Sequence, residues 1–273
     1  MKGSTRRKAV FSMAPISTQH DFRVSTRTKP YNPLVSALTE LVNEVSFIGS
    51  HPHATGATLP RYLAWNVRCA FQRPAIVPLT GYGIELFCPP QRRGPAKLAY
   101  IFRDRYDDEL AMVRRFVGLG DRAIDIGANI GIYTVVLASL VGPSGHVLAV
   151  EAASANISVL QRSIALNDFD NVTVVHTAVS NREGTVKFGL HSDPGRSSLV
   201  AETDRFESVG LTRLDSLVLA RPVRFVKIDI EGAEPLAFLG AEIILSGDRP
   251  TIQFESTPGA DSAYGYEPGL LWH

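Results

Sequence analysis

The pattern best suited to holding a small molecule is Asp125-x-Gly127-x-Asn129-x-Gly131, which follows a short apolar run. Glycines at a turn let the backbone bend sharply and approach a ligand closely. A helix that opens directly after the turn offers unpaired backbone N–H groups. A turn that holds a pyrophosphate would read Gly-x-Gly-x-x-Gly. Because Asp125 would repel a diphosphate, the turn favours a cationic ligand.

Glu151 supplies a second part of the expected site. It ends the next apolar run along the chain, where a carboxylate can accept hydrogen bonds from both hydroxyls of a ribose. A ribose combined with a cationic group and no phosphate describes S-adenosylmethionine, which carries an ammonium and a sulfonium. A nucleotide-dependent oxidoreductase or transferase is the alternative, and the absence of Gly-x-Gly-x-x-Gly argues against it.

Ionisable residues also interrupt an apolar run nearer the carboxyl end, where Lys227, Asp229 and Glu231 alternate with valine and isoleucine. Strands inside a parallel sheet are usually apolar on both faces, so we expect these charges to mark a site. A carboxylate there can serve as the general base for a hydroxyl acceptor. Asp229 is the first candidate, Glu231 the second, and Glu255, at the end of the next strand, the third. Asp229 and Glu231 could instead hold Mg²⁺, but no complete ligand set is visible, and we predict no metal.

Two motifs together point to a family. Asp-Ile-Gly-Ala-Asn-Ile-Gly at 125–131 and Lys-Ile-Asp-Ile-Glu-Gly-Ala-Glu at 227–234 resemble the FkbM-type S-adenosylmethionine-dependent methyltransferases. The resemblance covers about residues 107–256 and implies a Rossmann-like fold, S-adenosylmethionine as donor and methylation of a hydroxyl on a sugar or polyketide-type small molecule.

The resemblance also assigns roles to individual residues. It implies that four residues surround the amino-acid part of the donor: Asp125, Gly127, Asn129 and Gly131. It places Glu151 at the ribose, and Asp229 and Glu231 near the acceptor. Many methyltransferases carry an acid after the third strand. The segment 176–180 lacks one, so we expect the adenine to contact the backbone at Ala178 or the side chain of Ser180.

The elements that must position these residues alternate between apolar strands and helical segments. The expected strands are 122–126, 146–151, 172–179, 224–230 and 251–254, and the expected helices are 130–141, 155–166 and 234–245. Repeated strand–helix–strand units predict an α/β fold with a mostly parallel sheet and helices on both faces. Ligands bind such sheets at the carboxyl ends of the strands, where the strand order reverses. The strands carrying Asp125 and Asp229 should flank that point.

Other parts of the chain differ from this domain in composition and in their pattern of apolar residues. Residues 1–30 are basic and Ser/Thr-rich and are predicted to be a disordered leader. Residues 31–104 are predicted to form an extension with helices from Pro33 and over 61–71, a hairpin of 75–79 with 84–88, and a third strand at 98–102. Another helix is expected from Asp107. The donor-binding domain is assigned to 105–256 and an irregular tail to 257–273.

The tail leads to one more expectation. The family fold continues after Glu255 with a helix and an antiparallel strand pair, which do not fit in the remaining 18 residues. We therefore expect the strand pair to be missing, leaving 251–254 as an edge strand that pairs with another chain, unless the amino-terminal extension covers it. A truncated donor-binding protein without catalytic activity is accordingly an alternative function.

Composition limits the remaining possibilities. The chain has 273 residues, is 45% hydrophobic, and carries 28 Lys and Arg against 27 Asp and Glu. A net charge of +1 disfavours nucleic-acid binding, and two widely separated cysteines disfavour a disulfide scaffold or a zinc site. No apolar run is long enough to span a membrane. We expect a cytoplasmic enzyme whose partner is a small-molecule acceptor.

Overall fold

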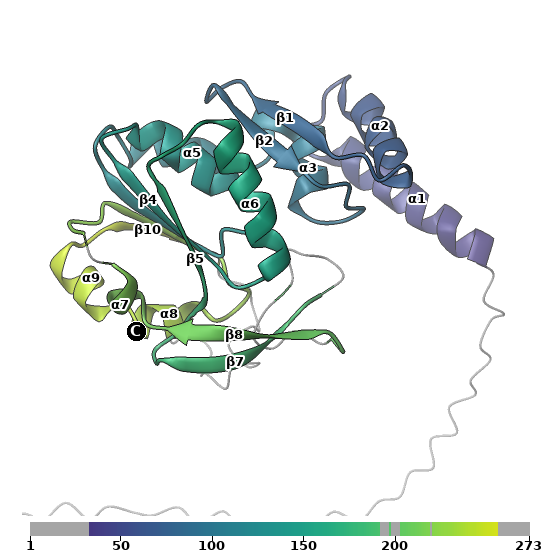
Figure 1. Cartoon of the computed structure of the whole chain (residues 1–273). Coiled ribbons are helices and arrows are strands. Elements are labelled where there is room, and N and C mark those ends of the chain that lie inside the picture. The colour runs from purple at the N-terminus through teal and green to yellow at the C-terminus, as the bar shows by residue number, and fades with distance from the viewer. Residues whose placement is uncertain (1–32, 192–196, 198–202, 219, 256–273) are drawn as a thin grey trace, which may run out of the picture. The chain divides into compact units, whose positions relative to one another are not determined.

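The computed structural model describes residues 33–191, 197, 203–218 and 220–255, with side chains from residue 42 (Figure 1). The chain forms two compact units, Met1–Glu44 and Val45–His273. The helix α1 (Pro33–Ser50) opens at the predicted proline, within the first unit. The predicted leader 1–30 and tail 257–273 lie outside the described residues. All further elements belong to the second unit.

A five-stranded parallel sheet forms the centre of the second unit. Its strands are β3 (Arg122–Ile126), β4 (His146–Glu151), β5 (Val172–His176), β9 (Phe225–Ile228) and β10 (Thr251–Phe254). Their order is β10-β9-β3-β4-β5, and every neighbouring pair is parallel. The predicted α/β class is confirmed. Three strands, β3, β4 and β10, match their expected bounds.

Helices cover both faces of this sheet, as predicted. On one face, Ala123, Val147 and Phe225 pack with apolar residues of α5 (Ile132–Val141). On the other, Ile124 and Ile126 pack with α8 (Glu234–Leu239) and α9 (Glu242–Gly247). Figure 1 shows α5 and α6 (Ser154–Leu166) on one side of the sheet and α7 (Leu214–Leu217), α8 and α9 on the other. Strand alternation thus directs Asp125 toward α5.

The predicted single helix 234–245 is wrong in one respect, because it divides at Gly240 into α8 and α9. A Cβ at Gly240 would collide with the carbonyl oxygen of Ser180. This close contact between the loop after β6 and the helix pair requires glycine at the point where the helix divides.

A second sheet was not predicted. It contains β6 (Ala178–Val179), β8 (Phe206–Thr212) and β7 (Gly184–Gly189), in the order β6-β8-β7. The expected strand 172–179 is therefore two strands, β5 and β6, which belong to different sheets. β7 and β8 are exposed along much of their length, so they lack the apolar runs that revealed the central strands.

The extension contains α2 (Thr58–Ala70), then the hairpin of β1 (Ala75–Leu79) and β2 (Ile84–Cys88), which matches the predicted bounds. The strand predicted at 98–102 is wrong, since these residues end the helix α3 (Pro95–Phe102). This short segment is apolar on all sides, and periodicity cannot separate a buried helix from a buried strand. A proline in its first turn favours the helix.

The helix expected from Asp107 is short. It comprises α4 (Asp108–Met112), followed by the 3₁₀ turn Val113–Arg115. Asp107 is the N-cap, and its Oδ1 accepts a hydrogen bond from the Glu109 N–H at 2.8 Å. Aspartate is a favoured N-cap because it satisfies an N–H group that the helix leaves free.

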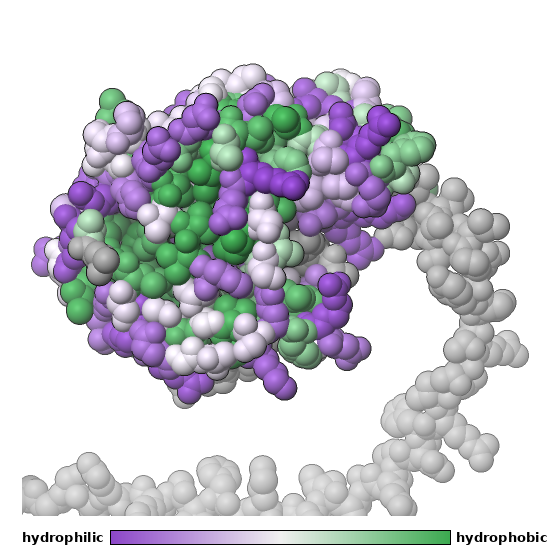
Figure 2. Space-filling model, in the orientation of Figure 1, coloured by the Kyte–Doolittle hydropathy of each residue, from purple (hydrophilic) through white to green (hydrophobic). Residues whose placement is uncertain are grey.

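The two edges of the central sheet are β5 and β10. β5 is only partly buried, and Figure 2 shows apolar residues at the surface over the part of the molecule where Figure 1 places the central sheet. β10 pairs with β9 and with no other strand of the described residues. The strand pair expected to be missing would fall in 256–273, outside those residues, so self-association through β10 stays a prediction. No described helix combines the length and apolar character that crossing a membrane requires.

Candidate donor-binding and active site

A cavity of about 700 Å³ lies at the carboxyl ends of β3, β4, β9 and β10. This is the predicted position, because the chain runs from β3 to β4 and β5 on one side and returns to β9 on the other. Eight of the nine predicted site residues line it: Asp125, Gly127, Asn129, Glu151, Ala178, Asp229, Glu231 and Glu255. The ninth, Gly131, does not.

The two glycines of the turn have different structural roles. Gly127 has φ +79°, and a Cβ there would collide with the carbonyl oxygen of Asp229. The turn after β3 therefore touches the loop after β9, and only glycine permits this approach. Gly131 has φ +92°, and a Cβ there would lie 2.5 Å from Leu160 Cδ1. Gly131 thus allows α5 to pack against α6 rather than lining the cavity.

Glu151 joins the glycine turn to the turn that follows β4. Its Oε2 accepts a hydrogen bond from the Asn129 N–H at 2.7 Å, and its Oε1 accepts one from the Ala153 N–H at 2.8 Å. Asn156 Nδ2 donates a third, longer hydrogen bond to Oε1 at 3.4 Å. A carboxylate has about four lone-pair sites, so capacity remains for a ligand hydroxyl. Burial raises the pKa of Glu151, while the two backbone N–H groups lower it.

Asp125 is buried beneath the turn. Its Oδ2 accepts a hydrogen bond from the Thr134 hydroxyl of α5 at 2.6 Å. Burial raises the pKa of Asp125 to about 6, against the opposing effects of the Thr134 hydroxyl and of Lys227. A cation bound in the cavity would favour the ionised form of this carboxyl.

Asn129 carries the clearest sign of an absent partner. Its backbone adopts φ +51°, in the left-handed region, where asparagine is tolerated better than most residues. Its side-chain Oδ1 is buried and has no hydrogen-bond partner among the described residues. Buried polar atoms are nearly always hydrogen-bonded, so this oxygen is suited to accept a hydrogen bond from a ligand.

Lys227 and Asp229 form an ion pair on the β9 side of the cavity. Lys227 Nζ lies 2.9 Å from Asp229 Oδ2, and it also lies 4.8 Å from the centre of the Tyr133 ring. The Lys227 side chain is 7% exposed, whereas that of Asp229 is 39% exposed. The lysine is thus fixed from two sides and holds one carboxylate oxygen of Asp229, while that carboxylate stays accessible from the cavity.

The other two candidate bases occupy the loops beyond β9 and β10. Glu231 has φ +54° in a loop held by Glu234, whose Oε1 accepts hydrogen bonds from the N–H groups of Ile230 at 3.0 Å and Gly232 at 3.3 Å. The sequence pattern predicted a strand over 224–230 that carries Lys227 and Asp229, but β9 ends at Ile228, so Asp229 and Glu231 both belong to the loop after it. Glu255 is exposed at the cavity rim.

The side of the cavity next to Glu151 is largely apolar. It is lined by Ala152, Ala178, Val179 and Phe188, of which Phe188 comes from the unpredicted strand β7. Ser180 does not line the cavity. Ala178 remains the candidate there.

Sequence reasoning missed a polar network on the opposite wall. The Tyr133 hydroxyl donates to Asp107 Oδ2 at 2.6 Å, and Gln253 Nε2 donates to the Tyr133 oxygen at 2.9 Å and to Glu109 Oε2 at 2.9 Å. Burial and the neighbouring Asp107 raise the pKa of Tyr133. These residues come from α4, α5 and β10, and no local pattern marks them as neighbours.

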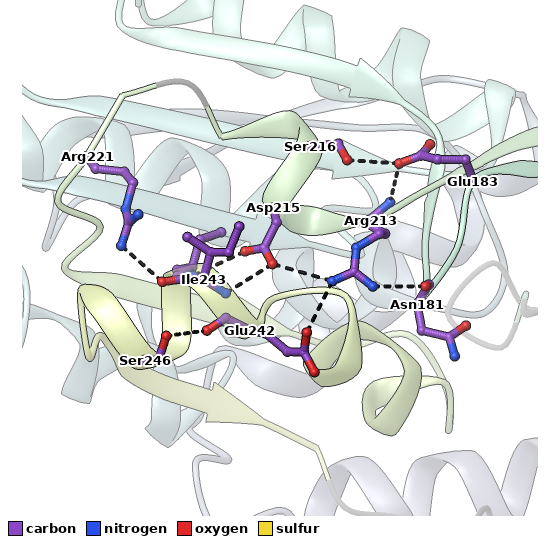
Figure 3. A network of polar contacts seen from close by, with 10 residues as sticks. Asn181, Glu183, Arg213, Asp215, Ser216, Arg221, Glu242, Ile243 and Ser246 are labelled. Atoms are coloured by element: carbon purple, nitrogen blue, oxygen red, sulfur yellow. Dashed lines mark hydrogen bonds and ion pairs between the residues drawn. The ribbon is translucent and has the colours of Figure 1, made fainter.

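A second polar cluster lies around α7 and α9 (Figure 3). Asp215 caps α9, since its two carboxylate oxygens accept hydrogen bonds from the N–H groups of Ile243 at 3.0 Å and Ile244 at 3.1 Å. Arg213 lies 3.6 Å from both Asp215 and Glu242. None of these residues lines the cavity. We call this group, as labelled in Figure 3, the Arg213 cluster.

Comparison with known proteins identifies the domain. The model of the methyltransferase FkbM domain matches residues 125–266. The solved structures that resemble the chain include a putative rRNA methylase from Clostridium thermocellum, which is 19% identical over 44% of this chain and 47% of that one, with a TM-score of 0.29. The chain therefore spans about half the length of that protein.

The descriptions of two other similar structures mention S-adenosyl-L-methionine or a SAM-dependent methyltransferase. Fibrillarin from Aeropyrum pernix, in complex with S-adenosyl-L-methionine, is 15% identical over 53% of this chain and 48% of that one, with a TM-score of 0.31. A SAM-dependent methyltransferase from Aquifex aeolicus is 14% identical over 55% and 67%, with a TM-score of 0.33. No curated protein matches the chain.

Proposed function

The chain belongs to the FkbM family of S-adenosylmethionine-dependent methyltransferases, and on that basis we propose that it methylates a hydroxyl oxygen of a small-molecule acceptor in the cavity described above. The observation that carries this proposal is that one cavity is lined both by the turns after β3 and β4, which Glu151 joins, and by Asp229 after β9. Glu151, Asn129 and Gly127 line one cavity with Asp229, so donor-binding and base residues meet in one place.

The residues fit the donor in three respects. Gly127 lets the turn after β3 meet the loop that carries Asp229, Asn129 Oδ1 is a buried acceptor without a partner among the described residues, and Asp125 and Glu151 offer carboxylates to a cation and to ribose hydroxyls. The apolar wall beside Ala178 suits an adenine. When bound, S-adenosylmethionine supplies an electrophilic methyl carbon.

Asp229 is the proposed base. Its carboxylate can accept the proton of the acceptor hydroxyl, because it is accessible from the cavity while Lys227 fixes one of its oxygens at 2.9 Å. A positioned base contributes roughly 10²–10⁴ to the rate of such a step. Glu231 and Glu255, which line the same cavity, are the second and third candidates.

A titration tests donor binding first. We expect calorimetry to detect S-adenosylmethionine and not NAD, because the turn lacks the diphosphate pattern and places Asp125 beneath it. Binding of NAD in preference to S-adenosylmethionine would contradict the proposal and support the oxidoreductase alternative.

Transfer of a tritiated methyl group to acceptors in a small-molecule screen then tests catalysis. With an acceptor in hand, Asp229→Asn should keep donor affinity and reduce turnover at least about a hundredfold. Asp170→Asn is the control, since Asp170 is exposed and does not line the cavity. Donor binding without transfer to any acceptor would support the inactive, donor-binding alternative. We also propose that the acceptor is a small molecule rather than a nucleic acid and that the enzyme acts in the cytoplasm.

A further inference from the structure

One side of the helix α2 exposes a continuous line of apolar side chains. The other side is buried at Tyr62, Trp65 and Cys69, and the ring centre of Trp65 lies 4.9 Å from that of Tyr100 in α3. The exposed side chains recur every fourth residue and are 47%, 55%, 57% and 71% exposed: Leu59, Leu63, Val67 and Phe71. Because residues four apart lie on one face of a helix, they form a stripe about 18 Å long. We call it the α2 stripe.

The α2 stripe lies outside the site described above. Single exposed apolar residues are common, but a contiguous apolar patch marks a surface that contacts another protein or a membrane. No residue of the stripe lines the donor cavity, and Figure 1 places α2 away from the central sheet. We therefore expect the stripe to contact a partner and to take no part in binding the donor.

The part of the extension that carries the α2 stripe is basic. Residues 45–103 contain seven Lys and Arg and one acidic residue, Glu85. Residues 104–273 contain 14 Lys and Arg against 23 Asp and Glu. The net charge of +1 for the whole chain thus combines parts of opposite sign. Such an asymmetry indicates an anionic partner for the basic part.

Three arginines lie in α2 or directly after it. Arg61 Nη1 donates to the carbonyl oxygen of Ile101 at 3.1 Å, and Arg68 Nη1 donates to that of Pro74 at 2.8 Å. Arg73 is exposed just beyond the end of the helix. A neutral carbonyl does not cancel the charge of an arginine, so Arg61 and Arg68 keep their full charge for an anionic partner. An arginine can also cover apolar surface with its stem while its guanidinium stays in a polar layer.

This combination of features fits an anionic membrane surface better than it fits two other partners. A nucleic acid offers phosphates but no apolar layer for leucine, valine and phenylalanine side chains. A second copy of this chain, docked through the same face, would bring two basic surfaces together, and like charges repel. An anionic bilayer offers both phosphates and an acyl layer, and an amphipathic helix binds it by lying in the interface.

We propose that α2 docks on an anionic lipid bilayer, with the α2 stripe at the boundary between headgroups and acyl chains and with Arg61, Arg68 and Arg73 at the lipid phosphates. The same surface repels the acidic residues 104–273, so contact is restricted to the extension. With 13 residues, α2 is too short to cross a bilayer and lies on it instead. This docking does not depend on the identity of the acceptor.

Co-sedimentation of the full chain with lipid vesicles tests this proposal. One vesicle is pure phosphatidylcholine, which is zwitterionic, and the other is an equal mixture of phosphatidylcholine and the anionic phosphatidylglycerol. The chain should bind the mixed vesicles at least about tenfold more tightly, because each arginine near an anionic surface adds attraction, and added salt should weaken this binding. Equal binding to both vesicles, or binding to neither, would overturn the proposal.

A pair of double variants assigns the binding to α2 rather than to basic residues elsewhere in the chain. Leu63→Gln combined with Val67→Gln should weaken binding to the mixed vesicles at least about tenfold, because polar side chains gain little from the acyl layer. Leu239→Gln combined with Ile243→Gln is the control, since these side chains are 46% and 58% exposed but belong to α8 and α9. Unchanged binding in the α2 variant, or an equal loss in the control, would overturn the proposal.

A charge variant and two further measurements separate the alternative partners. Arg73→Gln should weaken binding to the mixed vesicles about fivefold. A dimer that light scattering detects without lipid, and that the α2 double variant abolishes, would assign the stripe to a second copy and overturn the proposal. Tighter binding of a single-stranded RNA oligonucleotide than of the mixed vesicles would overturn it as well. The α2 double variant should keep its affinity for S-adenosylmethionine, so failure of the wild type to bind this donor would refute only the proposed function.

Discussion

The Arg213 cluster and the cavity are both rich in carboxylates, but they differ in how those carboxylates are satisfied. In the Arg213 cluster, Asp215 accepts two backbone N–H groups, and Glu183 Oε1 accepts the Arg213 N–H at 3.1 Å and the Ser216 hydroxyl at 2.9 Å. In the cavity, Glu151 also accepts two backbone N–H groups, but seven of the described lining residues carry carboxylates and one of them, Lys227, carries a cation. The first group ties elements together, whereas the second leaves negative charge facing a space where a ligand fits.

This difference separates stabilising charges from functional ones. Clustered charge of one sign is unfavourable in the folded protein, and departures of this kind are expected at functional sites. Variants in the Arg213 cluster should therefore act on stability. Variants in the cavity should act on binding, except where a cavity residue also holds two turns together.

The largest effect is expected at Gly127, where the turn after β3 touches the loop after β9. Gly127→Ala should destabilise the protein by at least about 3 kcal/mol and abolish donor binding, because its Cβ would meet a backbone oxygen that cannot move aside. Gly83→Ala is the matched control. Gly83 also has positive φ, +67°, but nothing lies within 4 Å of its Cβ position. Its strain alone should cost about 1–2 kcal/mol.

Urea denaturation of both glycine variants measures the free energy of unfolding that each one loses. A loss in Gly127→Ala no greater than in Gly83→Ala would show that conformational strain, rather than contact between the two loops, explains the glycine.

An intermediate effect is expected from the protonation of Asp125, whose pKa burial raises from 3.8 to about 6. An acid with a higher pKa in the folded state contributes stability that is complete below its unfolded pKa and is lost as the pH rises through about 6. Relative to Asp125→Asn, the wild type should therefore lose roughly 2–3 kcal/mol of unfolding free energy between about pH 4 and pH 7. Urea titrations of both proteins at several pH values measure this difference, and a constant difference would refute the raised pKa.

The smallest effect is expected for Glu242, at the exposed rim of the Arg213 cluster. Its side chain is 71% exposed and lies 3.6 Å from Arg213. Exposed ion pairs contribute about 0–1 kcal/mol, so Glu242→Ala should shift the unfolding free energy by no more than about 0.5 kcal/mol. A loss above about 1 kcal/mol in denaturant titrations would mean that the cluster is more tightly coupled than its exposure suggests.

The two walls of the cavity also differ in how far the sequence reveals them. The donor wall is built from residues close together in the chain, from Asp125 to Glu151, and its strands are mostly apolar and are followed by clear turns, so both the elements and the site could be predicted. The other wall joins Asp107 at the start of α4, Tyr133 of α5 and Gln253 of β10. Only tertiary packing brings these residues together, and no local pattern marks them.

The errors in the fold have related physical causes. The apolar pattern of the segment that ends at Phe102 is compatible with either a buried helix or a buried strand. The β7 and β8 strands are half exposed and carry a weak pattern. Gly240, where the expected helix divides, touches Ser180, which lies about sixty residues away in the sequence.

The most direct test compares Glu151→Ala with Asp215→Ala. Both wild-type carboxylates are largely buried, and each accepts two backbone N–H groups, so both variants should lose about 1–3 kcal/mol of stability. Calorimetric titration of S-adenosylmethionine, below both unfolding transitions, should then show roughly 10–100-fold weaker binding in Glu151→Ala alone. Unchanged affinity in folded Glu151→Ala, or an equal loss in Asp215→Ala, would contradict the distinction between a ligand-binding cavity and a stabilising cluster.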